Sequence, residues 1–157
     1  EIIAGRDNAD LVIIETMSDA YEAKAALLAA KENCDLPVFT SMSFEARGRT
    51  FTGCTVESYG ITAAGLGADA VGINCSSGPD QMGSVVRMMH RAAGDTPIAA
   101  KPTAGLPTIT ETGEAVYSMG PEAFVRHMQA LKASGAALLG GCCGTTPEFI
   151  AAMRSLK

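Results

Sequence analysis

The residues with the clearest chemical potential are three cysteines that lie in two short segments. Cys75 follows an apolar run, whereas Cys142 and Cys143 are adjacent and lie between glycines in the sequence GGCCG. Adjacent side chains of an extended strand point to opposite faces, so neighbouring thiols face one point only where the backbone bends, which glycine permits. Three thiolates suit Zn²⁺ and leave a fourth position open, as in catalytic sites. We therefore predict one Zn²⁺ ion held by Cys75, Cys142 and Cys143.

The charge of such a site indicates its reaction. Zn²⁺ with three thiolates carries a net negative charge, which makes the site a poor Lewis acid for activating water. It is well suited to binding a fourth thiol as thiolate, because coordination to a metal deprotonates a thiol. The expected chemistry is S-alkylation of a thiol substrate, with Cys75, Cys142 and Cys143 as the catalytic residues. Cys34 and Cys54 have no such neighbours and are predicted to be non-ligands.

Alternating strand and helix segments must position these cysteines. Each predicted strand is apolar throughout, which is typical of a parallel sheet covered on both faces. No G-x-G-x-x-G follows the first strand, which disfavours a dinucleotide-binding sheet. The predicted strands are residues 10–16, 36–42, 70–74, 97–101 and 136–139, and the predicted helices are residues 20–33, 55–66, 78–93, 121–134 and 145 to the C-terminus. Residues 43–54 and 102–119 are predicted to be loops.

The fold class is therefore α/β, and two architectures remain open: a doubly wound sheet, or part of a (β/α)8 barrel. A complete barrel needs eight units and about 250 residues, and five units do not close one. In either architecture, the loops that follow the strands lie along one edge of the sheet. Cys75 follows the third predicted strand, and Cys142 and Cys143 follow the fifth. We expect all three thiols to lie within roughly 8 Å of one another, as a shared metal requires.

Composition and charge exclude several classes of protein. The 157 residues are 47% apolar and 18% charged, which fits one folded domain rather than a disordered chain. The net charge is −5 and the basic residues are scattered, so no nucleic-acid or membrane partner is expected. No apolar run reaches the ~18 residues that span a bilayer. Five cysteines without a visible signal peptide favour a reducing, cytoplasmic location over a disulfide framework.

Two motifs together resemble the homocysteine S-methyltransferase family. They are Gly72-Ile73-Asn74-Cys75 followed by Gly78-Pro79, and the segment GGCCGTTP at residues 140–147. Three further stretches support the resemblance, which covers essentially the whole chain but only the C-terminal part of the family domain. They are Glu15-Thr16 with Asp19, the segment FEARGRTFTG at residues 44–53, and the segment KPTAGLP at residues 101–107.

The resemblance implies a partial barrel domain over residues 1–157, equivalent to strands four to eight of a (β/α)8 TIM-type barrel whose N-terminal strands one to three are absent. It implies that Cys75, Cys142 and Cys143 hold zinc and that homocysteine adds its thiolate as the fourth ligand. Glu15 would bind the substrate amino group, while the missing first loop would hold the carboxylate. Asn74 and Thr103 are the other predicted substrate-binding residues. Thr103 replaces an Asn that is common in the family and that can occupy the fourth zinc position when substrate is absent. Water is therefore expected to take that position in this chain.

The methyl donor is predicted from the segment after the fourth predicted strand. Residues 108–119, leading into Gly120-Pro121 and Phe124, most resemble cobalamin-dependent methionine synthases. This resemblance implies methylcobalamin as donor, bound by a separate corrinoid-binding module. Betaine or S-methylmethionine as donor, a non-catalytic zinc-binding fragment, and a barrel enzyme with incidental cysteines remain alternatives. A chain that lacks three of eight barrel strands is expected to be inactive alone, with open edges at residues 10–16 and 136–139.

Overall fold

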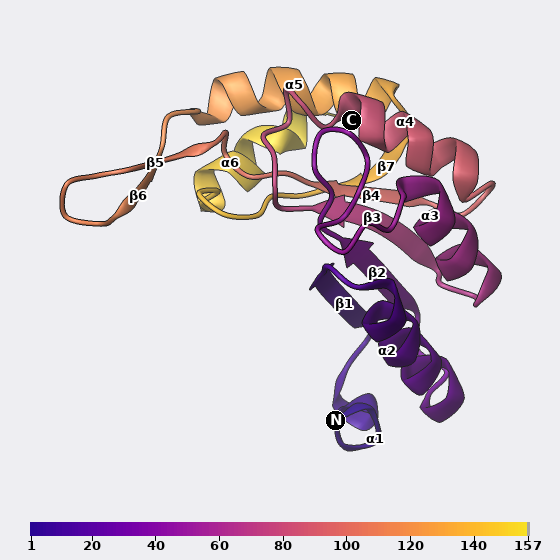
Figure 1. Ribbon diagram of the computed structural model, residues 1–157. Helices are drawn as coiled ribbons and strands as arrows, with labels where there is room; N and C mark the ends of the chain where they lie inside the picture. Colours follow the sequence, from indigo (N-terminus) through magenta and orange to yellow (C-terminus); the bar gives the residue numbers. More distant parts are fainter. Residues whose placement is uncertain (157) are drawn as a thin grey trace.

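The computed structural model describes residues 1–156 and contains a curved parallel sheet (Figure 1). Within these residues the sheet has five strands in the order β1-β2-β3-β4-β7. Neighbouring strands pair in parallel throughout, which confirms the α/β class predicted from the apolar segments. The strands are β1 (Val12–Met17), β2 (Val38–Met42), β3 (Ala70–Asn74), β4 (Ile98–Lys101) and β7 (Ala136–Leu139).

Helices connect successive strands, and local sequence signals explain where most of them begin. Asp19 caps α2 by accepting hydrogen bonds from the amides of Tyr21 and Glu22, and Thr55 caps α3 through the amide of Ser58. Proline occupies the first turn of both α5 and α6, where its missing N–H costs nothing. The helices are α1 (Ile2–Gly5), α2 (Ala20–Asn33), α3 (Val56–Gly65), α4 (Gly83–Ala92), α5 (Pro121–Ala133) and α6 (Pro147–Ala152), with short 3-10 helices at Arg6–Asn8 and Met153–Ser155.

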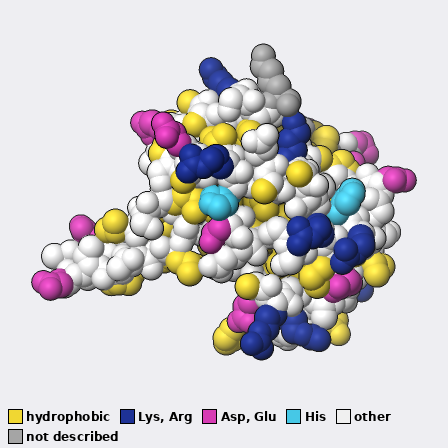
Figure 2. All heavy atoms as spheres, turned by 90° about the horizontal axis from the view of Figure 1, so that it is seen from above, with side chains coloured by type: hydrophobic (Ala, Val, Ile, Leu, Met, Phe, Trp, Pro, Cys, Tyr) yellow, Lys and Arg dark blue, Asp and Glu magenta, His cyan; other side chains and the backbone are white. Residues whose placement is uncertain are grey.

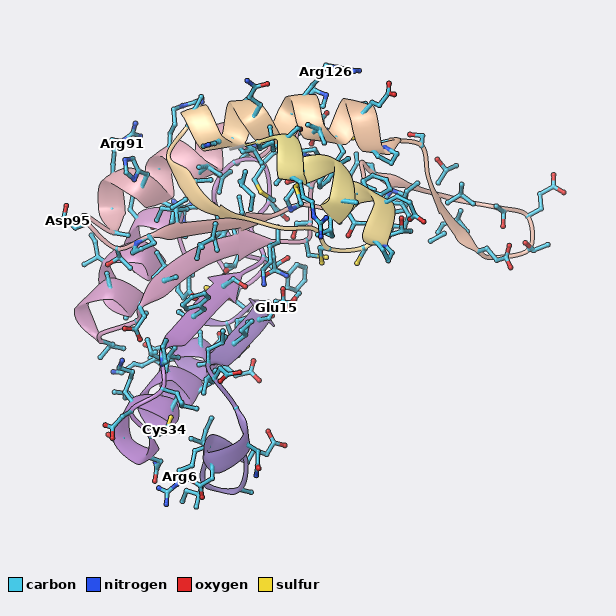
Figure 3. All side chains as sticks on the ribbon, turned by 180° about the vertical axis from the view of Figure 1, so that it is seen from behind. Arg6, Glu15, Cys34, Arg91, Asp95 and Arg126 are labelled. Atoms are coloured by element: carbon cyan, nitrogen blue, oxygen red, sulfur yellow. The ribbon has the colours of Figure 1, made fainter. Side chains whose placement is uncertain are left out.

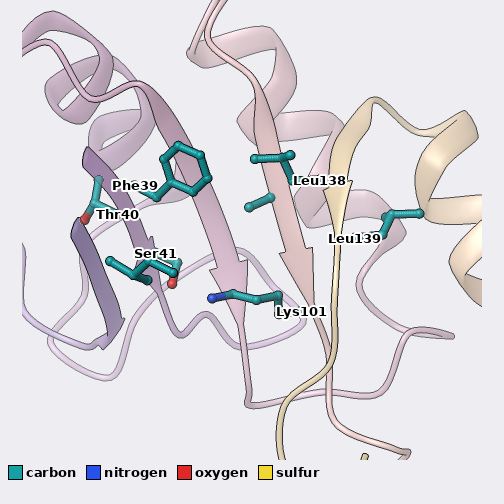
Figure 4. Close-up of a pocket in the computed structure, with 8 residues that line it drawn as sticks. Phe39, Thr40, Ser41, Lys101, Leu138 and Leu139 are labelled. Carbon is teal, nitrogen blue, oxygen red and sulfur yellow. The ribbon is translucent and has the colours of Figure 1, made fainter. Parts of the chain in front are cut away.

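The two faces of the sheet differ sharply in burial. The convex face packs against the helices through a continuous apolar core that includes Val38, Val71, Ile73 and Ile98. The concave face is hollow, with a cavity of about 160 Å³ (Figure 4). Four of the five strands contribute to its lining. The residues that line it are Ile13, Phe39, Thr40, Ser41, Ala99, Lys101, Leu138 and Leu139.

The edge strands depart from the burial expected of them. All strands are predicted to be covered on both faces, but β1 and β7 each carry exposed side chains. Ile13 is 52% exposed and Leu138 is 37% exposed. Their apolar character fits a covered face, yet within residues 1–156 only the convex face carries helices (Figure 1). The concave surface between the two edges is therefore left uncovered.

Several elements differ from the sequence prediction, including α1, which was not predicted. Helix α4 begins at Gly83 rather than at residue 78, because Pro79 and Asp80 lie in a turn before it. The predicted loop at residues 102–119 contains an antiparallel hairpin, β5 (Pro107–Ile109) and β6 (Ala115–Tyr117), which projects from the body of the molecule (Figure 1). Gly113 supplies the positive φ of +83° that its turn requires. Lys157, the end of the last predicted helix, lies outside the described residues.

The surface carries charges of both signs. Figure 2 shows lysine, arginine and acidic side chains interspersed over one face, with acidic side chains near the tip of the projecting hairpin. Among the described residues, no helix is both long enough and apolar enough to cross a membrane.

Candidate metal centre

The structure brings the thiols of Cys75, Cys142 and Cys143 together, and their sulfur atoms all lie within 4.8 Å of one another. The Cys75 and Cys143 sulfurs are 3.7 Å apart, and those of Cys142 and Cys143 are 3.9 Å apart. Tetrahedral coordination of zinc at ~2.3 Å from each sulfur places ligand sulfurs about 3.8 Å apart. The spacing therefore fits a zinc ion, and the expectation that the three thiols converge is confirmed. Cys143 is exposed and the other two are partly exposed, so solvent reaches the group.

A left-handed backbone turns Cys75 toward the other two thiols. Cys75 and Ser76 have φ values of +60° and +58°, immediately after the last residue of β3. Such a conformation is unfavourable for residues other than glycine and persists only where surrounding contacts hold it. Here the Cys75 amide donates to the carbonyl of Lys101 at 3.1 Å, and the Ser77 amide donates to the carbonyl of Cys75 at 2.6 Å. The chain accepts local strain at the position where a ligand must bend out of the strand direction.

The segment after β4 holds both cysteine-bearing loops through backbone atoms. The carbonyl of Lys101 accepts from the Cys75 amide, and the carbonyl of Pro102 accepts from the Cys142 amide at 2.9 Å. The amide of Ala104 donates to the carbonyl of Cys143 at 2.9 Å. Residues 101–104 thus lie between the two loops and fix the position of one relative to the other.

The glycines around Cys142 and Cys143 act mainly through close packing rather than through backbone freedom. Gly144 has a φ of +77°, whereas Gly140 and Gly141 have ordinary negative values. A Cβ on Gly140 would lie 2.9 Å from Cγ of Lys101, and one on Gly141 would collide with the side chain of Thr145. A Cβ on Gly144 would collide with the ring of Tyr117. Backbone freedom, the predicted role of these glycines, applies to Gly144 alone, whereas all three make room for other side chains.

Asn74 connects the thiol group to β1. Its side chain is fully buried, and its Oδ1 accepts from the Thr16 amide at 3.1 Å and from the Ser41 hydroxyl at 2.9 Å. Its Nδ2 donates to the Thr16 hydroxyl at 2.6 Å and lies 3.9 Å from the sulfur of Cys142. Thr16 has a φ of +59°, so the end of β1 also bends at this contact. All polar atoms of Asn74 are engaged with the protein itself.

Burial, together with the neighbouring thiols of Cys142 and Cys143, raises the pKa of the Cys75 thiol to about 11. Without a metal this thiol therefore stays protonated at neutral pH, and a metal ion must displace its proton. Desolvation and the nearby thiol of Cys143 also raise the pKa of the Tyr117 phenol. Tyr117 belongs to β6, so the base of the projecting hairpin lies against the thiol group.

Glu15 and Thr103 lie near the thiol group, whereas Cys34 and Cys54 lie away from it. Glu15 lies on the edge strand β1, toward its C-terminal end (Figure 3), and its carboxylate forms an ion pair with Lys101. Thr103 is buried, and its hydroxyl donates to the carbonyl of Gly105 at 2.6 Å. Cys34 lies near Arg6 at the opposite end of α2, and its thiol donates to the carbonyl of Ala30 (Figure 3). Like Cys54, it is outside the thiol group.

The profile described as homocysteine S-methyltransferase matches residues 3–156, which is nearly the whole chain and includes all three clustered cysteines. The chain belongs to the homocysteine S-methyltransferase family. The resemblance seen in the two cysteine motifs is thereby confirmed.

Curated relatives of this homocysteine S-methyltransferase family member include two mycobacterial methionine synthases. Those of Mycobacterium leprae (strain TN) and Mycobacterium tuberculosis (strain ATCC 25618 / H37Rv) are each 33% identical, over 148 and 159 residues. The matches cover 90% and 95% of this chain, but only 12% and 13% of the relatives. The chain therefore spans about one eighth of the length of these relatives.

Solved structures show the same fold over a larger domain. The Escherichia coli homocysteine methyltransferase MmuM matches with a TM-score of 0.73 at 23% identity, both in its apo form and in its metallated form. These matches cover 96% of this chain and 50% or 46% of the MmuM chain. A Schiff base-forming fructose-1,6-bisphosphate aldolase matches with a TM-score of 0.56 at 20% identity. This family member therefore has the fold of about half of the MmuM chain.

Sequence reasoning did not single out three residues that the structure places around the site. Lys101 and Thr16 both belong to quoted motifs without a predicted role, although a lysine at the C-terminal end of a predicted strand is itself a signal. Thr16 and Tyr117 carry no such signal, because their roles depend on a left-handed backbone and on a hairpin hidden in a predicted loop.

Proposed function

We propose that this chain contributes the metal centre of a zinc-dependent enzyme that transfers a methyl group to the thiol of homocysteine, giving methionine. The observation that carries the proposal is the group of three thiols at tetrahedral spacing, from Cys75, Cys142 and Cys143. Family membership supports homocysteine as the methyl acceptor. A bound zinc ion would lower the pKa of a coordinated thiol and thereby supply a thiolate nucleophile at neutral pH.

The chain's own residues bind and orient the substrate in this proposal. Glu15 lies on the concave face and would accept charge-assisted hydrogen bonds from the α-ammonium group. Asn74 orients the site, because its side-chain amide connects the end of β1 to the loop of Cys142. Thr103 lines the same edge, but its hydroxyl is bonded to Gly105, which supports water in the resting fourth position.

The sheet is proposed to be strands four to eight of a (β/α)8 barrel. Its curvature, its uncovered apolar concave face and its coverage of half of the MmuM chain support this assignment. In a complete barrel, strands one to three would lie between β1 and β7 and would cover Ile13 and Leu138. The first of these units would bring the loop that holds the substrate carboxylate, so residues 1–157 alone are expected to be inactive.

Methylcobalamin is proposed as the methyl donor, bound by a separate corrinoid-binding module. The proposal is supported by the two relatives named methionine synthase and by the small share of their length that this chain covers. Residues 108–119, whose sequence suggested this donor, form most of the projecting hairpin, and its base lies against the thiol group through Tyr117. Betaine or S-methylmethionine as the donor is the alternative.

Metal content and methyl transfer test the proposal together. The complete protein is expected to bind one zinc ion, and replacement of Cys75, Cys142 or Cys143 by Ser should remove the metal and the activity. Cys34→Ser is the matched control, since Cys34 lies outside the thiol group and should leave both unchanged. Activity is measured as homocysteine-dependent demethylation of methylcobalamin, with betaine and S-methylmethionine as alternative donors. Zinc binding without transfer from any donor would indicate a non-catalytic metal-binding protein, and absence of zinc would refute the proposal.

A further inference from the structure

An ion pair crosses the concave face of the sheet. Nζ of Lys101, on β4, pairs with Oε1 of Glu15, on β1, although β2 and β3 lie between these strands. In a flat sheet, strands three places apart would be separated by about 14 Å, given a spacing of about 4.8 Å between neighbours. The pair forms because the sheet curves and both side chains point into the hollow, as the inward course of Lys101 shows (Figure 4).

The surroundings of the pair favour contact with a charged ligand. The Lys101 side chain is 22% exposed and that of Glu15 is 43% exposed, so both remain accessible. Apolar side chains, including Ile13, Phe39 and Leu138, line the same hollow, so the ion pair provides charged groups within a mostly apolar surface. An ammonium group has three donors and a carboxylate has about four acceptor sites, so one mutual contact leaves both groups able to bind more.

The pair is also connected to the thiol group on both sides. The carbonyl of Lys101 accepts from the amide of Cys75, and Gly140 leaves room for the Lys101 side chain directly before the Cys142 loop. On the other side, Thr16 follows Glu15 and is hydrogen-bonded to Asn74, whose amide lies 3.9 Å from the Cys142 sulfur. A ligand that contacts the ion pair therefore lies on the same edge as the thiols.

We propose that Lys101 and Glu15 together recognise the zwitterionic head of an α-amino acid, with Lys101 binding the α-carboxylate and Glu15 binding the α-ammonium. This assignment rests on the proposed function, in which the ligand is homocysteine. An α-amino acid carries both charges on one carbon atom, which complements an existing pair of opposite charges. Lys101 would give the α-carboxylate a second, side-chain contact from β4, beside its contact with the loop of the first barrel unit.

The pair predicts discrimination among thiols. Because Lys101 already compensates the charge of Glu15, an amine without a carboxylate must compete with the lysine and gains little. A mercapto acid without an amine must likewise compete with Glu15 for Lys101, and it also gains little. An amino acid replaces one internal ion pair by two contacts with the ligand, so it alone keeps all charges compensated. Lys101 is therefore a specificity-determining residue of the substrate site.

Binding of two probes to Lys101→Met separates this role from simpler ones. The complete zinc-loaded protein is titrated calorimetrically with L-homocysteine and with 3-aminopropane-1-thiol, which retains the thiol and the amine but lacks the carboxylate. The substitution should weaken L-homocysteine about tenfold or more, as expected for loss of a charge-assisted hydrogen bond, and should leave the amine unchanged or tighter. Lys101→Arg keeps the charge and should retain most of the L-homocysteine affinity. Lys31→Met, which breaks the remote pair with Asp69, is the matched control.

Each other outcome has a distinct meaning. Equal weakening of both probes would show that Lys101 only holds Glu15 in place, and tighter binding of both would show that it only competes for Glu15; either result overturns this proposal alone. Binding of neither probe to the wild-type zinc-loaded protein would overturn the proposed function and this inference with it. Unchanged zinc content and circular dichroism of Lys101→Met establish that the variant is folded.

Discussion

Replacement of Asn74 by Ala is expected to weaken both the fold and the metal centre. The side chain is fully buried and takes part in three hydrogen bonds of ordinary length, at 2.6, 2.9 and 3.1 Å. Its loss leaves the Ser41 hydroxyl, which is 3% exposed, without its acceptor, whereas the more exposed Thr16 groups can turn to water. An unsatisfied buried group costs about 1–3 kcal/mol and each remaining hydrogen bond about 0.5–1.5 kcal/mol. We therefore expect a loss of about 2–6 kcal/mol in the free energy of unfolding.

The same substitution is expected to reduce zinc affinity about 10- to 100-fold, which is typical for loss of a residue that orients metal ligands. Asn74 reaches the Cys142 sulfur at 3.9 Å and ties β1 to that loop, so its removal frees one ligand from its fixed position. Zinc affinity is measured by competition with a chromogenic chelator, and stability by urea unfolding of the metal-free protein.

Two variants make the prediction specific. Asn33→Ala removes an exposed Asn whose amide donates to the carbonyl of Ala29, and it should change neither quantity appreciably. Ser41→Ala removes the hydroxyl that donates to Asn74 and should recover part of the stability lost by Asn74→Ala when the two are combined. If Asn74→Ala unfolds with less than about 0.5 kcal/mol of change and binds zinc normally, the reasoning from its hydrogen bonds is wrong.

Three further predictions follow from individual contacts. The pKa of the Cys75 thiol is raised from 9.0 to about 11, so its contribution to stability is complete below pH 9 and is lost as pH rises through 11. Urea unfolding of the metal-free protein should show this loss of stability, and Cys75→Ser should lack it. Identical pH profiles of the two proteins would contradict the prediction. Tyr59→Phe removes a buried hydroxyl that lies 2.7 Å from Oγ1 of Thr40, and should cost about 1–2 kcal/mol of unfolding free energy, whereas a neutral effect would indicate that water replaces the contact. Gly140→Ala places a Cβ 2.9 Å from Cγ of Lys101 and should weaken L-homocysteine binding without loss of zinc; loss of zinc instead would show that the glycine serves the thiols.

The sequence predicted the features that depend on chain order and apolar runs. Strands 70–74 and 136–139 have their predicted bounds, and helix 20–33 also matches, with Asp19 as the cap at its N-terminus. Parallel pairing then brings Cys75 to the same edge as Cys142 and Cys143, whatever the details of the loops.

Other features depend on geometry that a single sequence does not encode locally. The pairing of Asn74 with Thr16 joins residues 58 positions apart, and the pairing of Lys101 with Glu15 requires the curvature of four strands. The hairpin at β5 and β6 was missed because its short strands are almost wholly exposed, and exposed strands show no apolar periodicity.

The segment after β4 has a consequence for how this site can change over evolutionary time or by engineering. It holds the two cysteine-bearing loops through the carbonyls of Lys101 and Pro102 and the amide of Ala104, and none of these contacts involves a side chain. The residue type at position 101 is therefore free to vary without moving the thiols, while its side chain faces the substrate hollow. A substitution at position 101 can therefore change ligand preference while it leaves the metal geometry unchanged. This makes residue 101 a suitable starting point for libraries that seek new thiol substrates.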